Sequence, residues 1–398
     1  MSTTTKKYIA IIDSISHDIF SNPTMVSLFE EFEKRNIHIL LFTEPFNFNK
    51  LSNNKNIQLF SLPQQTAVLP RRPAKVLKFI LQYIQVLKVI KKYNVKQVFA
   101  IDATGLLVAG RLKKINTKLE LNYISFEILF KNELNEKPLL LLKNKEIQYS
   151  KWVKTVLVQD KLRASNLLSE NSFFEKSKLF HIPVSPNIKN IKISVNKFQK
   201  SNLGLPIDAK VLVHSGDIDI YNGFDLLIEA LKLGIPKPYF ILVHYRKKLD
   251  TNNPLHAELL KLQKEGYPII VHDNRFISYN EYCSFIKSFD FGIVFYKTKL
   301  GSYAGGKNLI DIGLSSGKFS TYMMLNLPTV VTYSSIYNEL NQQYTFGAVI
   351  NNAQEFVDVL KNNLLLNIPT NNCKKLYDEQ LYPADRIMGY LDTFTHII

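Results

Sequence analysis

The chain has 398 residues, of which 46% are hydrophobic and 12% aromatic, and its formal net charge is +16. This length favours two domains, and this composition excludes an intrinsically disordered chain. The positive charge suits anionic partners, but the sequence has no zinc-finger spacing, RRM-like aromatic signature or basic leucine zipper, so we expect no nucleic-acid binding.

The first half of the chain alternates strand-like and helix-like segments, which is typical of α/β folds with parallel sheets. Its predicted strands span 8–12, 37–43, 57–62, 97–101, 121–126 and 155–158, and its predicted helices span 23–35, 74–93, 104–114 and 161–168.

The predicted helix 74–93 lies in a stretch, 71–92, that is rich in Lys and Arg and has no acidic residue. A basic amphipathic helix can lie on an anionic membrane, so 71–92 is a candidate for peripheral membrane contact. Most amphipathic helices pack their apolar side inward, and a core-facing helix with a solvated basic face is the alternative. The basic residues are Arg71, Arg72, Lys75, Lys78, Lys88, Lys91 and Lys92.

A segment with three prolines and many Asn and Lys residues, 183–206, reads as a linker between two domains. A second α/β series follows it. Its predicted strands span 211–214, 239–244, 268–271, 291–295, 329–332 and 348–350, and its predicted helices span 224–232, 281–288, 318–325, 354–363 and 382–395. We predict domains at 1–185 and 207–378, a linker at 186–206, and a terminal helix within 379–398.

The segment 313–332, GLSSGKFSTYMMLNLPTVVT, reads as loop, helix N-terminus, helix, turn and strand. The first turn of a helix leaves backbone N–H groups free, and its dipole favours an anion. Ser315, Ser316 and Gly317 allow a phosphate to approach closely, and Lys318 adds a positive charge. An ordinary αβ unit with a Ser N-cap is the alternative.

Several segments together resemble the GT-B glycosyltransferases. VLVHSGDIDIYNGFDLLIEAL is similar to the strand, Gly-containing loop and helix that open their donor domain, and FISYNEYCSFIKSFDFGIVFY to the helix and strand before their donor site. GLSSGKFSTYMMLNLPTVVT resembles their donor-binding segment. YISFEILF and KWVKTVLVQDKLRASNLL are similar to segments of bacterial family-4-like transferases that build surface polysaccharides. The resemblance implies two Rossmann-like domains facing across a cleft, with a C-terminal helix crossing back to the first.

Two features depart from the better-known members of that family. Those members carry an Arg and a Lys in the first donor-domain loop, where this chain has Asp217 and Asn222. They also carry two glutamates near the donor sugar and ribose, and the matching positions here are Gly313 and Thr321. Donor binding must therefore use other groups, or this half binds no donor.

Candidates that could replace the missing donor-binding residues lie on three loops. Gly216 opens the first donor-domain loop, and Arg246 with Lys247 follows the strand 239–244. Ligands of α/β folds bind beyond the carboxyl ends of strands, so these residues and those at 315–318 are the predicted donor site. Arg246 can pair with phosphate through two hydrogen bonds, and a solvated surface cluster is the alternative. Lys307 and Asn308 lie on a Gly-rich loop that either closes over the donor or is plain surface.

Three residues follow first-half strands and are candidates for the group that accepts the acceptor's proton: Asp102, Glu127 and His17. Each has a structural alternative, and for Asp102 this is the N-cap of the helix 104–114. Asp160 and Arg163 fit helix capping and pairing better than chemistry. The acidic pair Asp217 and Asp219 lacks matching ligands, so we predict no metal site.

The main hypothesis is a metal-independent glycosyltransferase that moves a sugar from a nucleotide sugar to a glycan or lipid-linked acceptor in bacterial surface polysaccharide biosynthesis. It needs no cofactor beyond its donor substrate. The alternatives are a non-catalytic partner that keeps the fold and a nucleotide-sugar 2-epimerase. Cys283 and Cys373 have no CxxC or metal spacing, and the chain has neither a signal-peptide core nor an apolar run of about 18 residues. We expect a cytoplasmic protein, peripheral at the inner face of the plasma membrane if 71–92 binds lipid.

Overall fold

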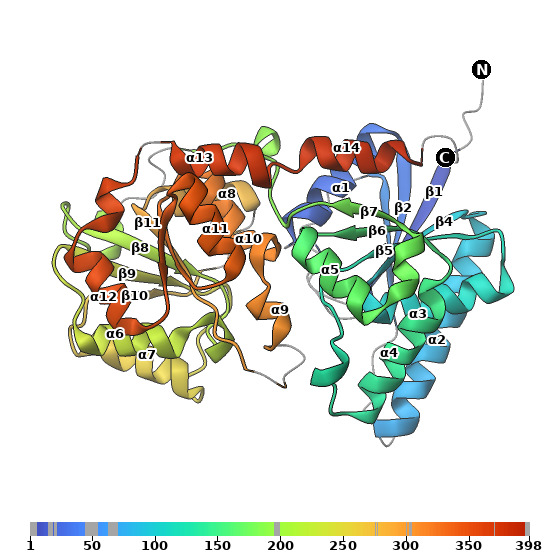
Figure 1. Ribbon diagram of the computed structural model, residues 1–398, viewed down its shortest axis with the longest axis horizontal. Helices are drawn as coiled ribbons and strands as arrows, with labels where there is room; N and C mark the ends of the chain where they lie inside the picture. Colours follow the sequence, from blue (N-terminus) through green and yellow to red (C-terminus); the bar gives the residue numbers. More distant parts are fainter. Residues whose placement is uncertain are drawn as a thin grey trace. The chain divides into compact units, whose positions relative to one another are not determined.

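A computed structural model describes residues 6–14, 19, 22–43, 55–62, 71–194, 200–274, 276, 278–299, 301, 305–369 and 371–394, without the side chains of 71–76. The chain divides into two compact units (Figure 1). Unit 1 is Met1–Pro183 together with Pro383–Ile398, and unit 2 is Val184–Tyr382. The segment predicted as a linker, 186–206, falls within unit 2, and its role as a linker stays a prediction. The return to unit 1 falls after Tyr382, inside the segment 379–398 predicted as one helix.

Unit 1 contains a seven-stranded parallel sheet in the order β3-β2-β1-β4-β5-β6-β7, counted over the described residues. The strands are β1 Lys7–Ile12, β2 Ile37–Thr43, β3 Ile57–Ser61, β4 Gln97–Ile101, β5 Glu120–Ile124, β6 Val153–Val158 and β7 Lys178–His181. Its central strands are continuous apolar runs because helices cover both faces.

The helices of unit 1 are α1 Pro23–Lys34, α2 Arg71–Lys92, α3 Asp102–Ile115, α4 Lys137–Ser150, α5 Lys161–Glu170 and α14 Ala384–Asp392. One face of the sheet packs against α1 and α14, and the other against α2, α3 and α5 (Figure 1). Tyr390 of α14 packs edge-on against Phe99 and Phe180. The predicted helical return of the chain end to the first domain is confirmed.

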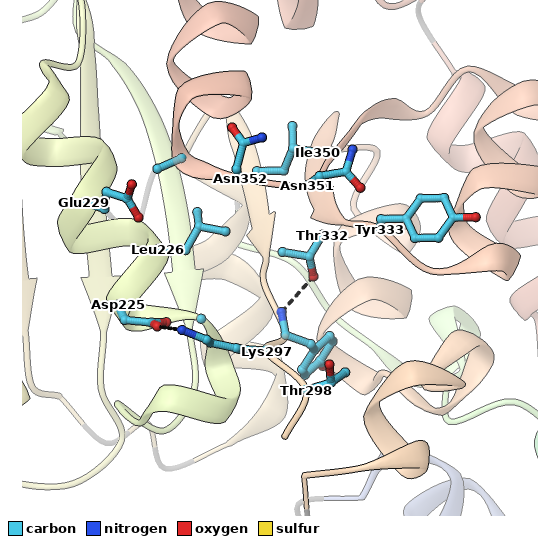
Figure 2. A pocket seen from close by; sticks show the side chains of 13 residues that line it. Asp225, Leu226, Glu229, Lys297, Thr298, Thr332, Tyr333, Ile350, Asn351 and Asn352 are labelled. Carbon is cyan, nitrogen blue, oxygen red and sulfur yellow. Dashed lines mark hydrogen bonds and ion pairs between the residues drawn. The ribbon is translucent and has the colours of Figure 1, made fainter. Parts of the chain in front are cut away.

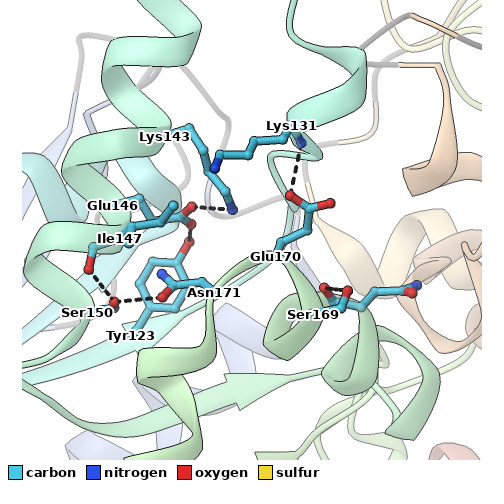
Figure 3. A network of polar contacts seen from close by, with 10 residues as sticks. Tyr123, Lys131, Lys143, Glu146, Ile147, Ser150, Ser169, Glu170 and Asn171 are labelled. Carbon is cyan, nitrogen blue, oxygen red and sulfur yellow. Dashed lines mark hydrogen bonds and ion pairs between the residues drawn. The ribbon is translucent and has the colours of Figure 1, made fainter.

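In unit 1, the helix α4 and the strand β7 were not predicted from the sequence. Sequence reasoning passes over α4 because its buried face is partly charged: Lys143 and Glu146 are 0% exposed. Figure 3 shows the network that makes this burial possible. Glu146 accepts hydrogen bonds from Lys143 Nζ at 2.8 Å and from Tyr123 Oη at 2.7 Å. Burial beside this carboxylate raises the pKa of Tyr123, which keeps its phenol protonated as a donor.

The helix α2 is apolar on two faces. Phe79, Tyr83, Val86 and Ile90 pack into the core of unit 1, as the core-facing interpretation predicted. Leu77, Ile80, Leu81 and Ile84 are about 40% exposed and follow the i, i+3, i+4, i+7 spacing of a second helix face. The helix therefore supports the core and also presents an apolar stripe to solvent.

Unit 2 contains a six-stranded parallel sheet in the order β10-β9-β8-β11-β12-β13, again over the described residues. The strands are β8 Lys210–Ser215, β9 Tyr239–His244, β10 Ile269–His272, β11 Phe291–Val294, β12 Thr329–Thr332 and β13 Gly347–Ile350. The strand order reverses between β8 and β11, which are neighbours. Crevices at such a reversal are where open α/β sheets bind ligands.

The helices of unit 2 are α6 Phe224–Leu233, α7 Pro254–Lys264, α8 Tyr279–Lys287, α9 Lys307–Ile310, α10 Gly317–Met324, α11 Ser335–Tyr344, α12 Ala353–Lys361 and α13 Asn372–Leu376. The first core cluster packs α8, α10, α11 and α13 on one face of the sheet, and the second packs α6, α7 and α12 on the other (Figure 1). The predicted pair of parallel-sheet, Rossmann-like units is therefore confirmed.

Candidate functional site

The helix α10 begins at the reversal point and has a side-chain N-cap. Ser316 Oγ accepts from the backbone N–H of Phe319 at 3.2 Å and lies 2.8 Å from Tyr296 Oη. The Ser316 hydroxyl thus organises the helix start. The N–H groups of Gly317 and Lys318 have no acceptor within the helix, because the first turn of a helix never supplies one.

The Lys318 ammonium is the most unusual group of this site. Its Nζ is buried and has no hydrogen-bond partner among the described residues. Burial lowers the pKa of Lys318 to about 7, Arg246 adds to this effect, and Asp219 and Asp217 oppose it. A buried, unpaired cation destabilises the ligand-free protein. Such a group is therefore a candidate for binding an anionic ligand.

The Lys318 side chain lies against the loop that follows β8. A Cβ added to Gly216 would be 3.7 Å from Lys318 Nζ. Gly216 has φ +145°, a conformation that side chains with a Cβ rarely adopt. On another side the ammonium lies 5.3 Å from the centre of the Tyr296 ring. The structure therefore brings together Gly216, Gly317 and Lys318 of the predicted donor site.

Tyr322 fixes α10 over the end of β8. Its hydroxyl donates to the carbonyl of Val213 at 3.0 Å and accepts from the N–H of Ser215 at 3.1 Å. The ring lies so close to Gly292 that a Cβ there would be 2.3 Å from Tyr322 Cδ2. Because Lys318 is one helical turn before Tyr322, these contacts set the position of the ammonium. Tyr296 and Tyr322 were not predicted, since a tyrosine in an apolar segment reads as core.

The predicted basic pair after β9 has partners from neighbouring elements. Lys247 Nζ forms an ion pair with Asp217 at 2.9 Å, and both side chains are exposed. The Arg246 guanidinium lies 4.8 Å from the centre of the Tyr282 ring. Asp217, found where the resembling transferases have Arg, thus holds a lysine from the adjacent loop.

The two positions that lack glutamates are buried. The Thr321 hydroxyl donates to the Gly317 carbonyl at 2.6 Å and is hydrogen-bonded to Tyr279 Oη at 2.6 Å. Gly313 begins a 3-10 turn, Gly313–Ser315, with φ +37°. Ser315, in the same turn, donates its N–H to the Ile312 carbonyl at 2.7 Å. Because Thr321 is 1% exposed, a longer charged side chain at this position would displace its neighbours.

The described part of the Gly-rich loop packs on the loop after β8. A Cβ on Gly305 would be 2.1 Å from the Tyr221 ring, so this contact requires glycine. Lys307 begins the short helix α9 and Asn308 is buried within it. A closing motion of this loop stays a prediction.

In unit 1, Asp102 and Glu127 are brought together at the carboxyl ends of β4 and β5. Asp102 Oδ1 accepts from the N–H groups of Phe126 at 2.7 Å and Glu127 at 3.0 Å. Asp102 has φ +52° and is the first residue of α3, whose N-cap is Ile101, so the N-cap alternative is wrong. The Glu127 side chain is exposed. His17 lies outside the described residues.

The motif VQDKLR, residues 158–163, supports the loop after β5 that carries Glu127. Asp160 caps α5 by accepting from the N–H of Arg163 at 2.8 Å, as predicted. The Arg163 guanidinium is buried and donates to the Phe126 carbonyl at 2.6 Å. Gln159 donates to the Ser125 carbonyl at 2.6 Å. These bonds and those of Asp102 fix the backbone that carries Glu127.

Within the described ranges, no group of three or more His, Cys, Asp or Glu side chains is placed to hold a metal ion. Over the same ranges, none of the helices combines the length and the apolar character needed to span a bilayer.

No protein-family model matches the sequence, and no curated protein matches it. Solved structures do resemble it. The HepE protein of Anabaena in complex with UDP-glucose has a TM-score of 0.74 at 13% identity, over 98% of this chain and 100% of that one. Sucrose-phosphate synthase from Thermosynechococcus elongatus has 0.71 at 12%, over 98% and 99%. WaaG, a glycosyltransferase involved in lipopolysaccharide biosynthesis, has 0.66 at 12%, over 97% and 99%. The fold is therefore GT-B.

Proposed function

We propose that this protein is a glycosyltransferase that moves a sugar from a nucleotide sugar to a glycan or lipid-linked acceptor, without a metal ion. The observation that carries the proposal is the buried Lys318 ammonium, which has no hydrogen-bond partner among the described residues and lies at the N-terminus of α10 beside the Gly216 loop. A diphosphate supplies the charge and the acceptors that this site needs. UDP-glucose is the first donor to test, because the similar HepE structure contains it.

The transfer breaks the bond between the sugar's anomeric carbon and the diphosphate oxygen, and forms a bond from that carbon to the acceptor oxygen. Negative charge develops on the leaving diphosphate. Lys318, the N–H groups of Gly317 and Lys318, and the α10 dipole stabilise that charge where a metal ion would otherwise do so. The acceptor's proton goes to a base, for which Asp102 and Glu127 are the candidates in the described chain. Since Asp102 Oδ1 already accepts two backbone N–H groups, we favour Glu127.

We assign the acceptor to bacterial surface polysaccharide. The support is the resemblance of the first half to such transferases and the structural likeness to WaaG, which acts in lipopolysaccharide biosynthesis. Acceptors of this class are often lipid-linked, so the enzyme would work at the cytoplasmic face of the membrane.

The exposed stripe of α2 supports a peripheral membrane contact. Leu77, Ile80, Leu81 and Ile84 form this stripe, and Lys78, Lys88, Lys91 and Lys92 lie on the same helix. Apolar side chains that enter the headgroup region, together with lysines that attract anionic lipid, are the requirements for interfacial binding.

Liposome flotation tests this contact. The double variant Ile80→Glu/Leu81→Glu should lose binding to vesicles that contain phosphatidylglycerol, and the control Leu364→Glu, an exposed leucine of unit 2, should keep it. Equal flotation on neutral and anionic vesicles, or no effect of the double variant, removes the membrane claim.

Thermal-shift screening tests the enzyme proposal. A panel of uridine, guanosine, cytidine and thymidine diphosphates and their sugars should contain a compound that raises Tm, because a ligand that binds only the folded state stabilises it. Lys318→Ala should reduce that rise. If no nucleotide changes Tm, the proposal is wrong, and if Lys318→Ala leaves the shift unchanged, the phosphate lies elsewhere.

A further inference from the structure

A second candidate site lies in unit 2, beyond the carboxyl ends of β11, β12 and β13. It is a groove of about 320 Å³, which is within the range of about 300–1,000 Å³ found for small-molecule sites. Asp225 and Glu229 of α6 form one wall and Tyr333 lies on the other side, with Asn351 and Thr332 between them (Figure 2). These residues are separate from the donor candidates at 315–318 and 246–247.

The groove contains hydrogen-bond acceptors that lack donors. Asp225 Oδ2 accepts from Lys297, whereas Asp225 Oδ1 is buried and has no partner among the described residues. The Asn351 amide nitrogen donates to Glu355 at 3.1 Å, which leaves its carbonyl oxygen as an acceptor. Of these two acceptors, Asp225 Oδ1 is buried and is therefore unfavourable without a donor, whereas Asn351 is exposed. A ligand with several O–H groups would satisfy them.

The charges of the groove disfavour ionic ligands. Lys297 is the cation among the lining residues, and it is already paired with Asp225. An anion would therefore meet Glu229 without a free positive charge. A divalent cation such as Ca²⁺ or Mg²⁺ is bound by several oxygen ligands that include carboxylates. Within the described ranges, no group of three or more His, Cys, Asp or Glu side chains could hold a metal ion. A neutral, hydroxyl-rich ligand fits best.

Tyr333 adds an apolar contact surface. Its side chain is 58% exposed at the end of β12, although large aromatic side chains usually bury most of their area. A sugar ring has a face of C–H groups that can cover an aromatic ring while its hydroxyls bind polar neighbours. The combination of Tyr333 with Asp225, Glu229 and Asn351 is suited to carbohydrate.

Tyr296 connects this groove to the candidate donor site. Its backbone N–H donates to Thr332 Oγ1 at 2.8 Å on the groove side. Its ring lies 5.3 Å from Lys318 Nζ, and its hydroxyl lies 2.8 Å from Ser316 Oγ, the cap of α10. A single side chain thus separates the two sites within unit 2.

We propose that the groove between α6 and Tyr333 binds a neutral segment of a glycan chain. It is a holding site that keeps a polymeric substrate or product on unit 2 beside the donor site. The proposal rests on the proposed function for its substrate class, because the glycan is the molecule that the transferase extends. Binding of the glycan to the groove itself requires no donor.

Saturation-transfer NMR and calorimetry with neutral oligosaccharides test it. The probes are tri- to hexasaccharides of glucose, galactose and N-acetylglucosamine, and spermidine serves as a cationic competitor. Asp225→Asn replaces the unpaired acceptor by a donor and should weaken glycan binding about tenfold. Tyr333→Ala should weaken it about fivefold. Phe173→Ala, an exposed aromatic residue of unit 1, is the matched control. The affinity for UDP is measured in each variant.

The expected result is glycan binding that both groove variants weaken and the control does not, with UDP affinity unchanged throughout. The proposal is overturned if the wild-type protein binds UDP but no oligosaccharide, or if the groove variants bind glycan normally. Displacement of glycan by spermidine, or binding of spermidine alone, would show a cation site instead. Failure of the proposed function is distinguishable, because it appears as the absence of binding of any uridine, guanosine, cytidine or thymidine diphosphate or sugar to the wild-type protein.

Discussion

Replacing Lys318 by Met should make the ligand-free protein more stable while weakening nucleotide binding. Met has nearly the length and shape of Lys but no charge, so the substitution removes the buried ammonium and keeps the packing around it. Lys318 Nζ has no protein partner among the described residues, and no hydrogen bond is lost. A residue that binds a ligand at the expense of stability is expected to behave in this way.

The magnitude follows from the pKa of Lys318. A fall from 10.5 to about 7 corresponds to ~5 kcal/mol of destabilisation by the protonated form, at about 1.4 kcal/mol per pKa unit. The pKa is lowered on folding, so the unfolded state binds more protons between pH 7 and 10.5 and stability rises with pH across that window. The penalty is complete below the folded pKa of about 7 and declines above it. The advantage of Lys318→Met should therefore be largest in mildly acidic buffer.

Thermal unfolding at several pH values, with calorimetric titration of UDP, provides the assay. Lys318→Met should raise the Tm of unit 2 by at least ~5 °C in mildly acidic buffer and weaken UDP binding by roughly 10- to 100-fold, the loss of a charged hydrogen bond. Wild-type affinity should fall as pH rises above about 7, and Lys318→Arg, which stays charged, should remove this dependence. A lower Tm for Lys318→Met, with unchanged UDP affinity, would show that the ammonium neither destabilises the fold nor binds the nucleotide.

Three further predictions concern the residues that support the sites. Asp102→Ala should lower the free energy of unfolding by ~2–3 kcal/mol, because two backbone N–H groups lose their acceptor. Asp102→Asn should lower the free energy of unfolding less, as measured by chemical denaturation, and should keep transferase activity. Loss of activity in a stable Asn variant would make Asp102 the base. Gly105→Ala should destabilise unit 1 by ~1–3 kcal/mol, since its Cβ would lie 2.5 Å from the Ile12 carbonyl oxygen; an unchanged denaturation midpoint would contradict this packing. Thr321→Glu introduces the glutamate that the resembling transferases carry at this position. It should lower Tm without improving UDP affinity, because Thr321 is 1% exposed and its hydroxyl is bonded to Tyr279; a gain in affinity would show that the site can accept the carboxylate.

The two parallel sheets could be predicted because strands buried on both faces are continuous apolar runs. YIAII and FILVH show this pattern, and both are strands. The helix α4 could not be predicted in the same way. Its buried face contains Lys143 and Glu146, whose burial depends on Tyr123, a residue of β5. Only the folded structure brings these three side chains together.

The candidate site was predictable where it depends on local sequence. The segment SSGK predicts a capped helix N-terminus with a nearby cation, and the structure places Ser316 and Lys318 accordingly. The contributions from distant residues were not predictable. Tyr322 reaches Val213 across 109 positions of sequence, and Lys247 pairs with Asp217 from the next loop. Such contacts follow from the order of the strands, which local patterns do not specify.

A crystal structure of the protein with UDP-glucose would locate the diphosphate relative to Lys318. A phosphate oxygen should lie within hydrogen-bond distance, about 2.7–3.2 Å, of Lys318 Nζ, with the N–H groups of Gly317 and Lys318 directed at the same diphosphate. An ordered nucleotide bound elsewhere in unit 2, with Lys318 Nζ still unpaired, would contradict it.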